Sequence, residues 1–247
     1  MDFGKELAVQ SYCFRGFKAN PEVIEKVKAI GLSRIELCGV HVDFANDAKF
    51  DEVIDLYRKA GVKICSIGVQ GFSGKADVER KWFEFAKRAG ATTISATFAL
   101  DTVPNCYRVA EKLADEYNIN LAIHNHGGRH WLGAAEMLNY VFKQTSPRVG
   151  LMLDTAWALH SHEDPVAMVE KFGSRLYGVH VKDFIFDRAG KHQDVVVGTG
   201  NLDLPKLFAA MKKINFSGNL ILEYEGEVSN PVPALTDCVV AVRGVKC

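Results

Sequence analysis

The chain has 247 residues, 48% of them hydrophobic, and its 30 lysines and arginines balance 30 aspartates and glutamates, giving a formal net charge of zero. This balance argues against a nucleic-acid or anionic-membrane partner, which calls for a basic excess, and the length suits one large domain, as in many α/β barrels. Neither a secretion signal nor a long apolar segment is found, so we expect a cytoplasmic protein without a membrane span.

Apolar runs and helical stretches alternate along the whole chain. The runs predicted as strands are Leu7–Phe14, Arg34–Cys38, Val62–Val69, Thr93–Phe98, Ile119–His124, Val149–Asp154, Leu176–Val181 and Gly218–Tyr224. The stretches predicted as helices are Pro21–Ile30, Phe50–Ala60, Ala76–Ala89, Val103–Tyr117, Ala134–Lys143, Pro165–Phe172, Leu204–Ile214 and Pro231–Val242. Strands joined by helical crossovers pair in parallel, and eight such units are enough to close a barrel.

The predicted fold is therefore a (β/α)8 TIM barrel, formed by a single domain over residues 1–247. An open doubly wound sheet is the alternative, although no GxGxxG follows the first strand. Asn20 and Asp164, each before a proline, are predicted helix N-caps. Gly31, Gly61 and Gly90 follow helices where a left-handed cap is needed.

Two further features of the chain carry structural predictions. The irregular segment Lys182–Gly200 contains the run Val195–Val197, which predicts an extended excursion over the barrel mouth. The six cysteines show no CxxC spacing or metal-finger pattern. We expect them to be reduced and structural, because free thiols in apolar runs behave as small hydrophobes.

Four late strands each end in a side chain that can bind a metal. These side chains are His124, Asp154, His180 and Glu223. Active-site groups of a parallel barrel gather at the C-terminal ends of its strands. We therefore expect these four side chains to converge on one site.

Five segments at or near these strand ends resemble the xylose isomerase-like TIM-barrel superfamily, specifically its sugar phosphate isomerase/epimerase branch. They are Leu121–Gly127 (LAIHNHG), Leu153–Trp157 (LDTAW), His180–Asp183 (HVKD), Gly198–Gly200 (GTG) and Leu222–Glu225 (LEYE). The resemblance covers nearly the whole chain. It implies a metal-dependent sugar, sugar phosphate or keto-sugar isomerase or epimerase, which abstracts a proton beside a carbonyl through a metal-stabilised enediolate.

The resemblance also implies one divalent cation held by His124, Asp154, His180 and Glu223. His124 departs from the family pattern, because this chain has His-Asn-His where the family commonly has Glu-Asn-His. Two imidazoles with two carboxylates favour borderline transition ions over magnesium. We expect manganese, cobalt or zinc, with magnesium as a further option.

The departure at His124 also affects the catalytic residues that the resemblance implies. Epimerases of this superfamily use two strand-end glutamates as bases on opposite faces of the substrate, and only Glu223 is retained here. His124 could take the missing role, since its ordinary pKa lies near neutrality. Lys182 lies on the same strand face as His180 and could neutralise an enediolate or bind a phosphate. One-base isomerisation and elimination, as in a dehydratase or lyase acting on a polyol or keto-acid, stay open.

A sugar-like small molecule is the predicted ligand, bound by side chains around the strand ends. The candidates are Phe14, Arg15, Glu36, His126, Arg129, His130, Trp131 and Trp157. For the aromatic residues, packing in the core is the alternative. For Glu36, a surface carboxylate or a supporting carboxylate behind the site is the alternative to accepting a sugar hydroxyl.

Several other classes of protein lack their characteristic motifs in this sequence, and others share the predicted fold. Acyl transfer, nucleotide hydrolysis and hydride transfer lack GxSxG, Walker and dinucleotide-binding motifs. A DNA-repair nuclease of the AP endonuclease kind needs a positive surface that a zero net charge does not favour. A metal-free sugar-binding barrel is the non-enzyme alternative, and a homo-oligomer is compatible with any of these classes.

Overall fold

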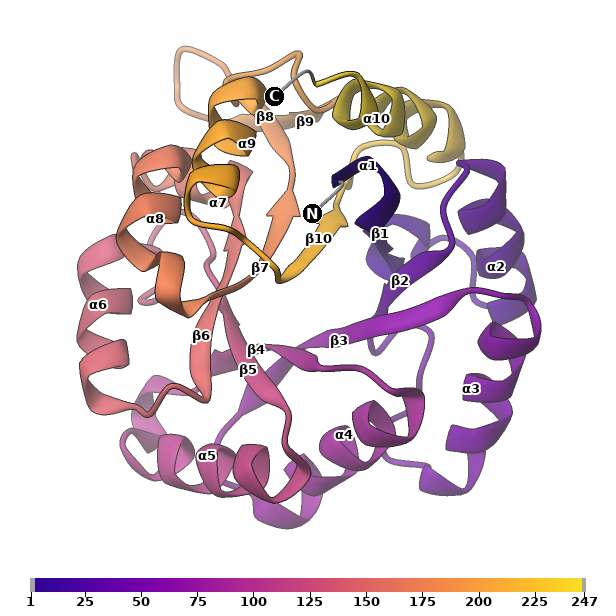
Figure 1. Cartoon of the computed structure of the whole chain (residues 1–247), viewed down its shortest axis with the longest axis vertical. Coiled ribbons are helices and arrows are strands. Elements are labelled where there is room, and N and C mark those ends of the chain that lie inside the picture. The colour runs from indigo at the N-terminus through magenta and orange to yellow at the C-terminus, as the bar shows by residue number, and fades with distance from the viewer. Residues whose placement is uncertain (1–2, 246–247) are drawn as a thin grey trace.

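Eight parallel strands close into a barrel in the computed structural model, which describes residues 3–245 (Figure 1). The order around the barrel is β1-β10-β7-β6-β5-β4-β3-β2, and β1 pairs with both β10 and β2. Helices surround the strands on the outside (Figure 1). This closure confirms the predicted (β/α)8 fold and rules out the open sheet.

The observed elements follow the predicted alternation. The barrel strands are β1 (Leu7–Gln10), β2 (Arg34–Leu37), β3 (Lys63–Phe72), β4 (Thr93–Phe98), β5 (Asn120–His124), β6 (Val149–Asp154), β7 (Leu176–Val181) and β10 (Asn219–Leu222). The helices are α1 (Phe3–Glu6), α2 (Asn20–Ala29), α3 (Phe50–Lys59), α4 (Ala76–Ala89), α5 (Asn105–Tyr117), α6 (Ala135–Gln144), α7 (Thr155–His160), α8 (Pro165–Phe172), α9 (Leu204–Lys213) and α10 (Val232–Gly244). The first predicted strand is too long, because residues Ser11–Phe14 form a 3₁₀ turn.

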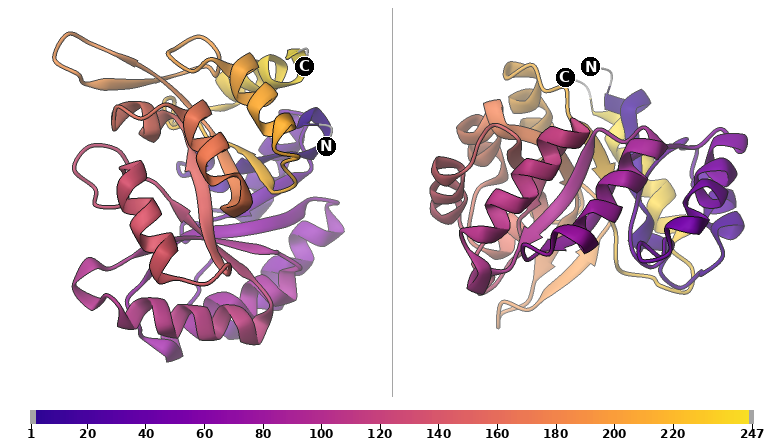
Figure 2. Two further views of the ribbon diagram at one scale, coloured as in Figure 1. Left: turned by 60° about the vertical axis from the view of Figure 1, so that its left-hand side comes forward. Right: turned by 90° about the horizontal axis from the view of Figure 1, so that it is seen from below.

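The excursion after β7 is an antiparallel hairpin of β8 (Asp183–Phe186) and β9 (His192–Val195). It projects from the barrel in both views of Figure 2. The carboxylate of Asp183 closes its base by accepting the backbone N–H groups of Gly198, Gly200 and Leu202 at 2.9–3.0 Å. A Cβ atom at Gly200 would lie 2.5 Å from Asp183 Oδ1, so the closure requires glycine there.

The predicted helix ends are mostly confirmed. Asp164 caps α8 by accepting the N–H of Val166 at 2.8 Å, and Gly31, Gly61 and Gly90 all have positive φ angles. The prediction for Asn20 is wrong, because α2 begins at this residue and its side chain makes no capping bond. Its amide instead donates to the carbonyl of His41 and accepts the hydroxyl of Tyr57.

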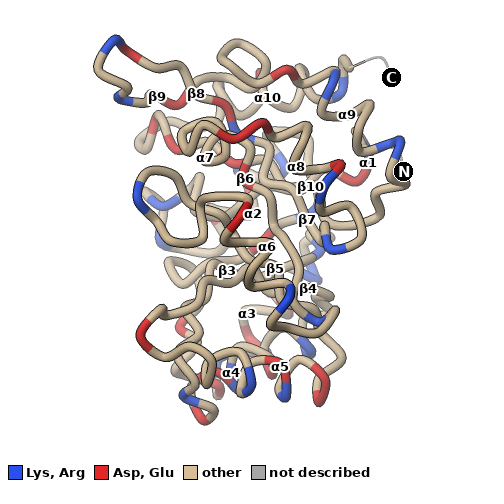
Figure 3. Tube along the Cα trace, turned by 90° about the vertical axis from the view of Figure 1, so that its left-hand side faces the viewer, with Lys and Arg blue, Asp and Glu red and all other residues tan. Residues whose placement is uncertain are grey.

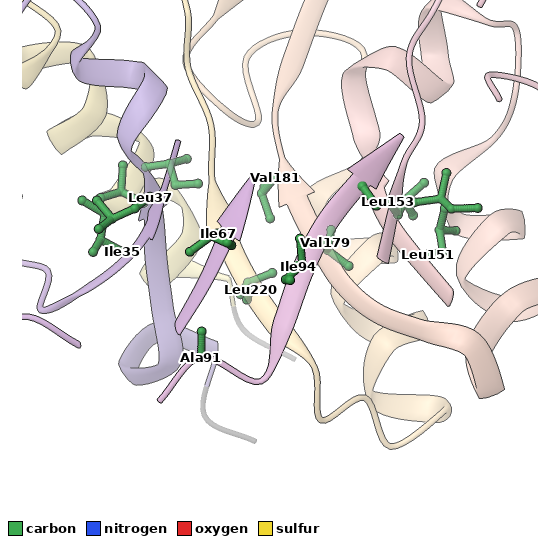
Figure 4. Packing of buried hydrophobic residues seen from close by; sticks show 14 of the residues in the cluster. Ile35, Leu37, Ile67, Ala91, Ile94, Leu151, Leu153, Val179, Val181 and Leu220 are labelled. Atoms are coloured by element: carbon green, nitrogen blue, oxygen red, sulfur yellow. The ribbon is translucent and has the colours of Figure 1, made fainter. Parts of the chain in front are cut away.

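Alternation along the strands sorts the side chains between two cores. Outward-facing residues such as Leu151, Leu153, Val179 and Val181 pack in the large core (Figure 4), which includes residues of the surrounding helices. A small separate cluster contains Ala8, Cys65, Ala122, Met152 and Ile221. Because side chains alternate with a period of two, His124 and Asp154 lie on the same side as Ala122 and Met152. The same two-residue alternation therefore places apolar side chains on the outside of the barrel and directs the polar strand-end side chains to its inside.

The described cysteines are free and buried, as the sequence predicted. Cys13, Cys38, Cys65, Cys106 and Cys238 are buried free thiols, whereas Cys247 lies outside the described residues. Burial raises the pKa of the Cys65 thiol to about 12, which keeps it unreactive.

Within residues 3–245, no helix combines the length and apolar character that a membrane span needs. Charges of both signs are interspersed along the chain (Figure 3).

Candidate metal centre

Four buried side chains from neighbouring strands converge at the C-terminal end of the barrel. His124 ends β5, Asp154 ends β6, His180 lies in β7, and Glu223 follows β10. One ligand atom from each lies within 4.8 Å of all the others. The four side chains predicted to meet do so, because their strands are consecutive neighbours in the barrel.

Asp154 is oriented by the helix that follows it. Its Oδ1 atom accepts the N–H of Trp157 at 2.8 Å and so caps α7, a helix that the sequence patterns did not predict. This bond leaves Oδ2 buried and without a hydrogen-bond partner. One oxygen therefore holds the helix, and the other faces His124 at 3.4 Å from its Nε2.

Asn125 joins the ends of β5 and β6. Its Oδ1 accepts the N–H of Asp154 at 2.8 Å, and its Nδ2 donates to the carbonyl of the same residue at 3.0 Å. The side chain is fully buried. This pair of bonds sets where Asp154 sits relative to His124.

Replacing Asn125 by alanine is expected to lower the free energy of unfolding by about 2 kcal/mol, because two buried hydrogen bonds are lost. Thermal and urea unfolding would measure this loss. Asn201→Ala is a suitable control, since Asn201 is exposed and its side-chain amide donates one bond, to the carbonyl of Phe184. An effect of Asn125→Ala no larger than that of the control would contradict the assignment.

His180 is held from both edges of its ring. Its Nδ1 lies 2.9 Å from Glu223 Oε2, and its Nε2 lies 2.9 Å from Glu36 Oε1. Glu36 has no exposed surface and also accepts Gln10 Nε2 at 2.5 Å and Ser95 Oγ at 2.6 Å. Glu36 thus anchors the Nε2 edge and leaves the Nδ1 edge to the site, as carboxylates behind ligating histidines do.

His124 presents its Nε2 atom to the carboxylates. This atom lies 3.4 Å from Asp154 Oδ2 and 3.6 Å from Glu223 Oε2, and it makes no hydrogen bond. The opposite ring atom, Nδ1, lies 3.4 Å from Nδ1 of His126. His126 therefore plays the same supporting part for His124 that Glu36 plays for His180.

The charges of the cluster favour a cation. Burial alone would lower the pKa of His180, but the carboxylates of Glu36 and Glu223 raise it to about 10. Burial likewise disfavours protonation of His124, yet Asp154 and Glu223 raise its pKa. Burial would raise the pKa of Glu223, but Lys182 and His180 hold it well below its usual range. Protons on the imidazoles and a metal ion would therefore compete for the same carboxylates.

The donor atoms fit a divalent ion. His124 Nε2 and Asp154 Oδ2 are both buried without a hydrogen-bond partner, a condition that is rare in native proteins and calls for an explanation. Two imidazole nitrogens and two carboxylate oxygens form a ligand set that suits zinc and neighbouring transition ions. His180 and Glu223 would complete the set.

A cavity of about 430 Å³ opens over this cluster. Its lining residues are Gln10, Tyr12, Cys38, Gly39, Val40, Gly68, Val69, His124, His126, Trp157, Glu223 and Glu225. Tyr12, Val69 and Trp157 provide apolar surface, and Gln10, His126 and Glu225 provide polar groups. Of the predicted substrate-binding residues, His126 and Trp157 are thus placed in the cavity wall.

Three predicted substrate-binding residues are held by contacts within the protein instead and do not line the cavity. Phe14 is fully buried in the hydrophobic core. Glu36 is enclosed behind His180, so it supports the ring rather than meeting a ligand. Trp131 packs against the core and donates its Nε1–H to the carbonyl of Phe98 at 3.1 Å. Phe14 and Trp131 thus pack with the hydrophobic core, which was the alternative to substrate binding for the aromatic residues.

The other three predicted residues also do not line the cavity. Arg15 stacks on Tyr12 and donates to the carbonyl of Glu225 at 2.6 Å. Arg129 is exposed on the loop after β5. His130 lies behind His126, with ring centroids 5.2 Å apart.

Lys182, predicted to be catalytic, is almost completely buried and forms an ion pair with Glu225. It is therefore not free to meet a ligand.

Several lining residues escaped the sequence patterns. Tyr12, Gly39 and Val40 follow β1 and β2, and Gly68 and Val69 lie within β3; none of these positions has a chemical signature of its own. Glu225 did have a signal, because it follows Glu223 by two residues and so shares its face. Continuing the two-residue alternation beyond the end of β10 would have identified Glu225 as a candidate.

Comparison with known proteins agrees with this geometry. Residues 24–238 match the family model described as xylose isomerase-like TIM barrel. The chain belongs to this family, which confirms the resemblance predicted from its motifs.

Curated relatives are enzymes or catabolic proteins. The rhizopine catabolism protein MocC of Rhizobium meliloti is 30% identical over 139 residues, which are 51% of this chain and 42% of that protein. An inosose dehydratase of Bacillus velezensis is 26% identical over 243 residues, covering 88% of this chain and 78% of the relative. The chain thus spans less than half of the first relative and about three quarters of the second. Such relatives support the prediction that the chain is an enzyme.

Solved structures share the fold at low sequence identity. The 3-keto-D-glucoside 4-epimerase YcjR from E. coli superposes with a TM-score of 0.72 at 16% identity, covering 96% of this chain and 98% of that chain. The IOLI protein, solved with a bound zinc atom, superposes with a TM-score of 0.76 at 16% identity, covering 98% and 99%.

Proposed function

We propose that this chain is a divalent-metal-dependent enzyme that moves a proton next to the carbonyl of a keto-sugar or related polyol ketone, giving isomerisation or epimerisation. The observation that carries the proposal is the convergence of four buried ligand atoms, two of them without hydrogen-bond partners, at a cavity wall. The named epimerase and the zinc-bound IOLI protein on the same fold support it.

The metal would be held by His124, Asp154, His180 and Glu223. A divalent ion bound there would polarise the substrate carbonyl as a Lewis acid. Manganese, cobalt and zinc suit this donor set better than magnesium.

Glu223 is the best-placed base of the chain. Its carboxylate lines the cavity, and Lys182 and His180 overcome the effect of burial to keep its pKa well below the usual range, so it is ionised and can accept a proton. A positioned carboxylate contributes roughly 10²–10⁴-fold to rate. The proton removed from carbon would pass to Glu223 and return from it to a neighbouring carbon, which gives isomerisation. Epimerisation would need a second proton donor on the opposite face of the substrate.

The cavity wall suits a sugar-like ring. Tyr12 and Trp157 offer aromatic faces for the C–H side of such a ligand. Burial together with the nearby His124 lowers the pKa of His126 to about 3, so this side chain is neutral at physiological pH. His126 therefore acts as a hydrogen-bonding group and not as a cation.

Solvent-deuterium exchange tests this proposal. Protein loaded in turn with manganese, cobalt or zinc is incubated in D₂O with a panel of keto-sugars and inososes, and deuterium at carbon is followed by mass spectrometry. We expect exchange with the wild type and a loss of at least about 10²-fold in Glu223→Gln, because a carboxylate base is removed. Stoichiometric metal without exchange on any panel member would contradict the proposal.

A dehydratase is the second candidate, favoured by a specific pair of observations. The metal cluster contains one glutamate, Glu223, because His124 occupies the place of the family's usual glutamate, and an inosose dehydratase is a relative over 88% of this chain. Elimination needs one base and loss of a hydroxyl group, whereas two-base epimerisation needs a second proton donor. Product mass reduced by one water would identify the dehydratase, and unchanged mass with exchange would identify the isomerase or epimerase.

A further inference from the structure

We infer that this cavity selects an uncharged polyhydroxy ketone and excludes phosphorylated or carboxylated counterparts, and that Glu225 determines this selectivity. The inference rests on the proposed function and narrows its substrate class. It starts from the charges around the cavity. Besides the phenol of Tyr12 and the thiol of Cys38, the ionisable side chains that line it are His124, His126, Glu223 and Glu225, and the described lining residues include no lysine or arginine.

Lys182, which contacts the lining residues Glu225 and Trp157, is neutralised by acidic neighbours. Lys182 is 1% exposed, and its Nζ forms an ion pair with Glu225 and lies 3.9 Å from Asp194 Oδ1. The ammonium group also lies over the rings of Trp157 and Phe184. Glu225 lines the cavity and Lys182 does not, so the carboxylate separates the ammonium from a bound ligand.

Arg15, which contacts the lining residues Tyr12 and Glu225, is likewise occupied. Arg15 donates to the backbone carbonyls of Tyr12 and Glu225, and its guanidinium packs on the Tyr12 ring. These contacts stabilise the segments that carry two cavity walls. They direct the cation to the protein backbone instead of toward a ligand.

These contacts decide which ligands fit. Because the carbonyl end of the substrate would occupy the ion, a phosphate or carboxylate elsewhere on the ligand would lose its hydration and face the Glu225 carboxylate, with no lysine or arginine among the lining residues to offset the charge. Hydroxyl groups can both donate and accept hydrogen bonds, and Gln10, His126 and Glu225 offer partners of both kinds. The cavity therefore favours a neutral ligand with many hydroxyl groups.

Inorganic phosphate is the probe that tests the role of Glu225. Its binding is measured by isothermal titration to zinc-loaded protein and again after chelation, which separates phosphate on the ion from phosphate at the wall. Glu225→Gln keeps the side-chain size and removes the charge, and Glu225→Ala also opens space toward Lys182. We expect phosphate to bind both variants about ten- to a hundredfold more tightly than wild type.

Two controls assign the gain to Lys182. Adding Lys182→Met to Glu225→Gln should remove the gain, as a double-mutant cycle requires. Asp194→Asn should give a smaller gain, because Asp194 lies farther from the ammonium and does not line the cavity. Wild-type affinity for phosphate equal to that of folded Glu225 variants would overturn the inference.

The wild type alone supplies an independent test. Deuterium exchange into matched pairs, such as D-fructose with D-fructose 6-phosphate, should favour the neutral member of every pair that reacts. Faster exchange into the phosphate ester would overturn the selectivity and leave the proposed proton transfer standing. Absence of exchange in all pairs would count against the proposed function, while the phosphate titration still decides the role of Glu225.

Discussion

Asp154→Asn is expected to abolish stoichiometric metal binding and leave the barrel folded. The asparagine amide still has an oxygen that can accept the N–H of Trp157, so the cap of α7 survives. In the wild type, Asp154 Oδ2 faces His124 without a hydrogen-bond partner. In the variant this position holds an uncharged amide oxygen or an NH₂ group. We expect metal affinity to fall at least about a hundredfold, at or beyond the upper end of the 10–100-fold effect of groups that support ligands.

The measurements are metal content after dialysis and affinity by competition with a coloured chelator. Asp164→Asn is the matched control, because Asp164 caps α8 in the same manner and lies outside the metal cluster. Both variants should have similar thermal stability, while only Asp154→Asn loses the metal and the exchange activity. Full metal occupancy in Asp154→Asn would remove the basis of the proposed site.

Glu36→Gln is expected to weaken metal binding about 10–100-fold although residue 36 does not touch the ion site. The carboxylate accepts the Nε2 edge of His180 and is fixed by Gln10 and Ser95. A glutamine amide has one oxygen acceptor where the carboxylate has two, so it cannot satisfy all three partners. His180 would lose its fixed ring orientation and part of its basicity toward a cation.

Affinity for zinc and the visible absorption of the cobalt-loaded protein measure this effect independently of catalysis. Glu79→Gln is the control, because Glu79 is an almost fully buried carboxylate that accepts the backbone N–H groups of Ser73, Gly74 and Lys75. That substitution should lower stability and leave metal affinity unchanged. A change in stability alone for Glu36→Gln would show that Glu36 supports the fold and not the ligand.

The strand ends could be predicted because local pattern and site chemistry coincide in them. In β6 the apolar residues Leu151 and Leu153 face outward, and Asp154, next in the chain, faces inward. The same alternation orients His124 and His180. A polar group at the end of a buried run was therefore a reliable sign of the site, and the family motifs agreed with it.

The cavity wall could not be predicted in the same way. Whether Tyr12 lines a cavity while Phe14 is buried depends on a 3₁₀ turn after β1 that apolar periodicity did not reveal. Lys182 and Glu225 both follow strand ends, and only their contact shows that one neutralises the other. The sequence shows that a lysine is present, but only the structure shows that its charge is neutralised by a neighbouring carboxylate.

The sequence by itself determined the barrel and the four residues that meet at its end, since these follow from alternation repeated over eight units and from closure. Tertiary structure alone decided which side chains support the four and which reach the cavity. Glu36 and His180 are 144 residues apart and meet across the barrel interior. Local patterns carry no information about such a pairing, because burial and hydrogen-bond satisfaction are settled only when distant segments pack together.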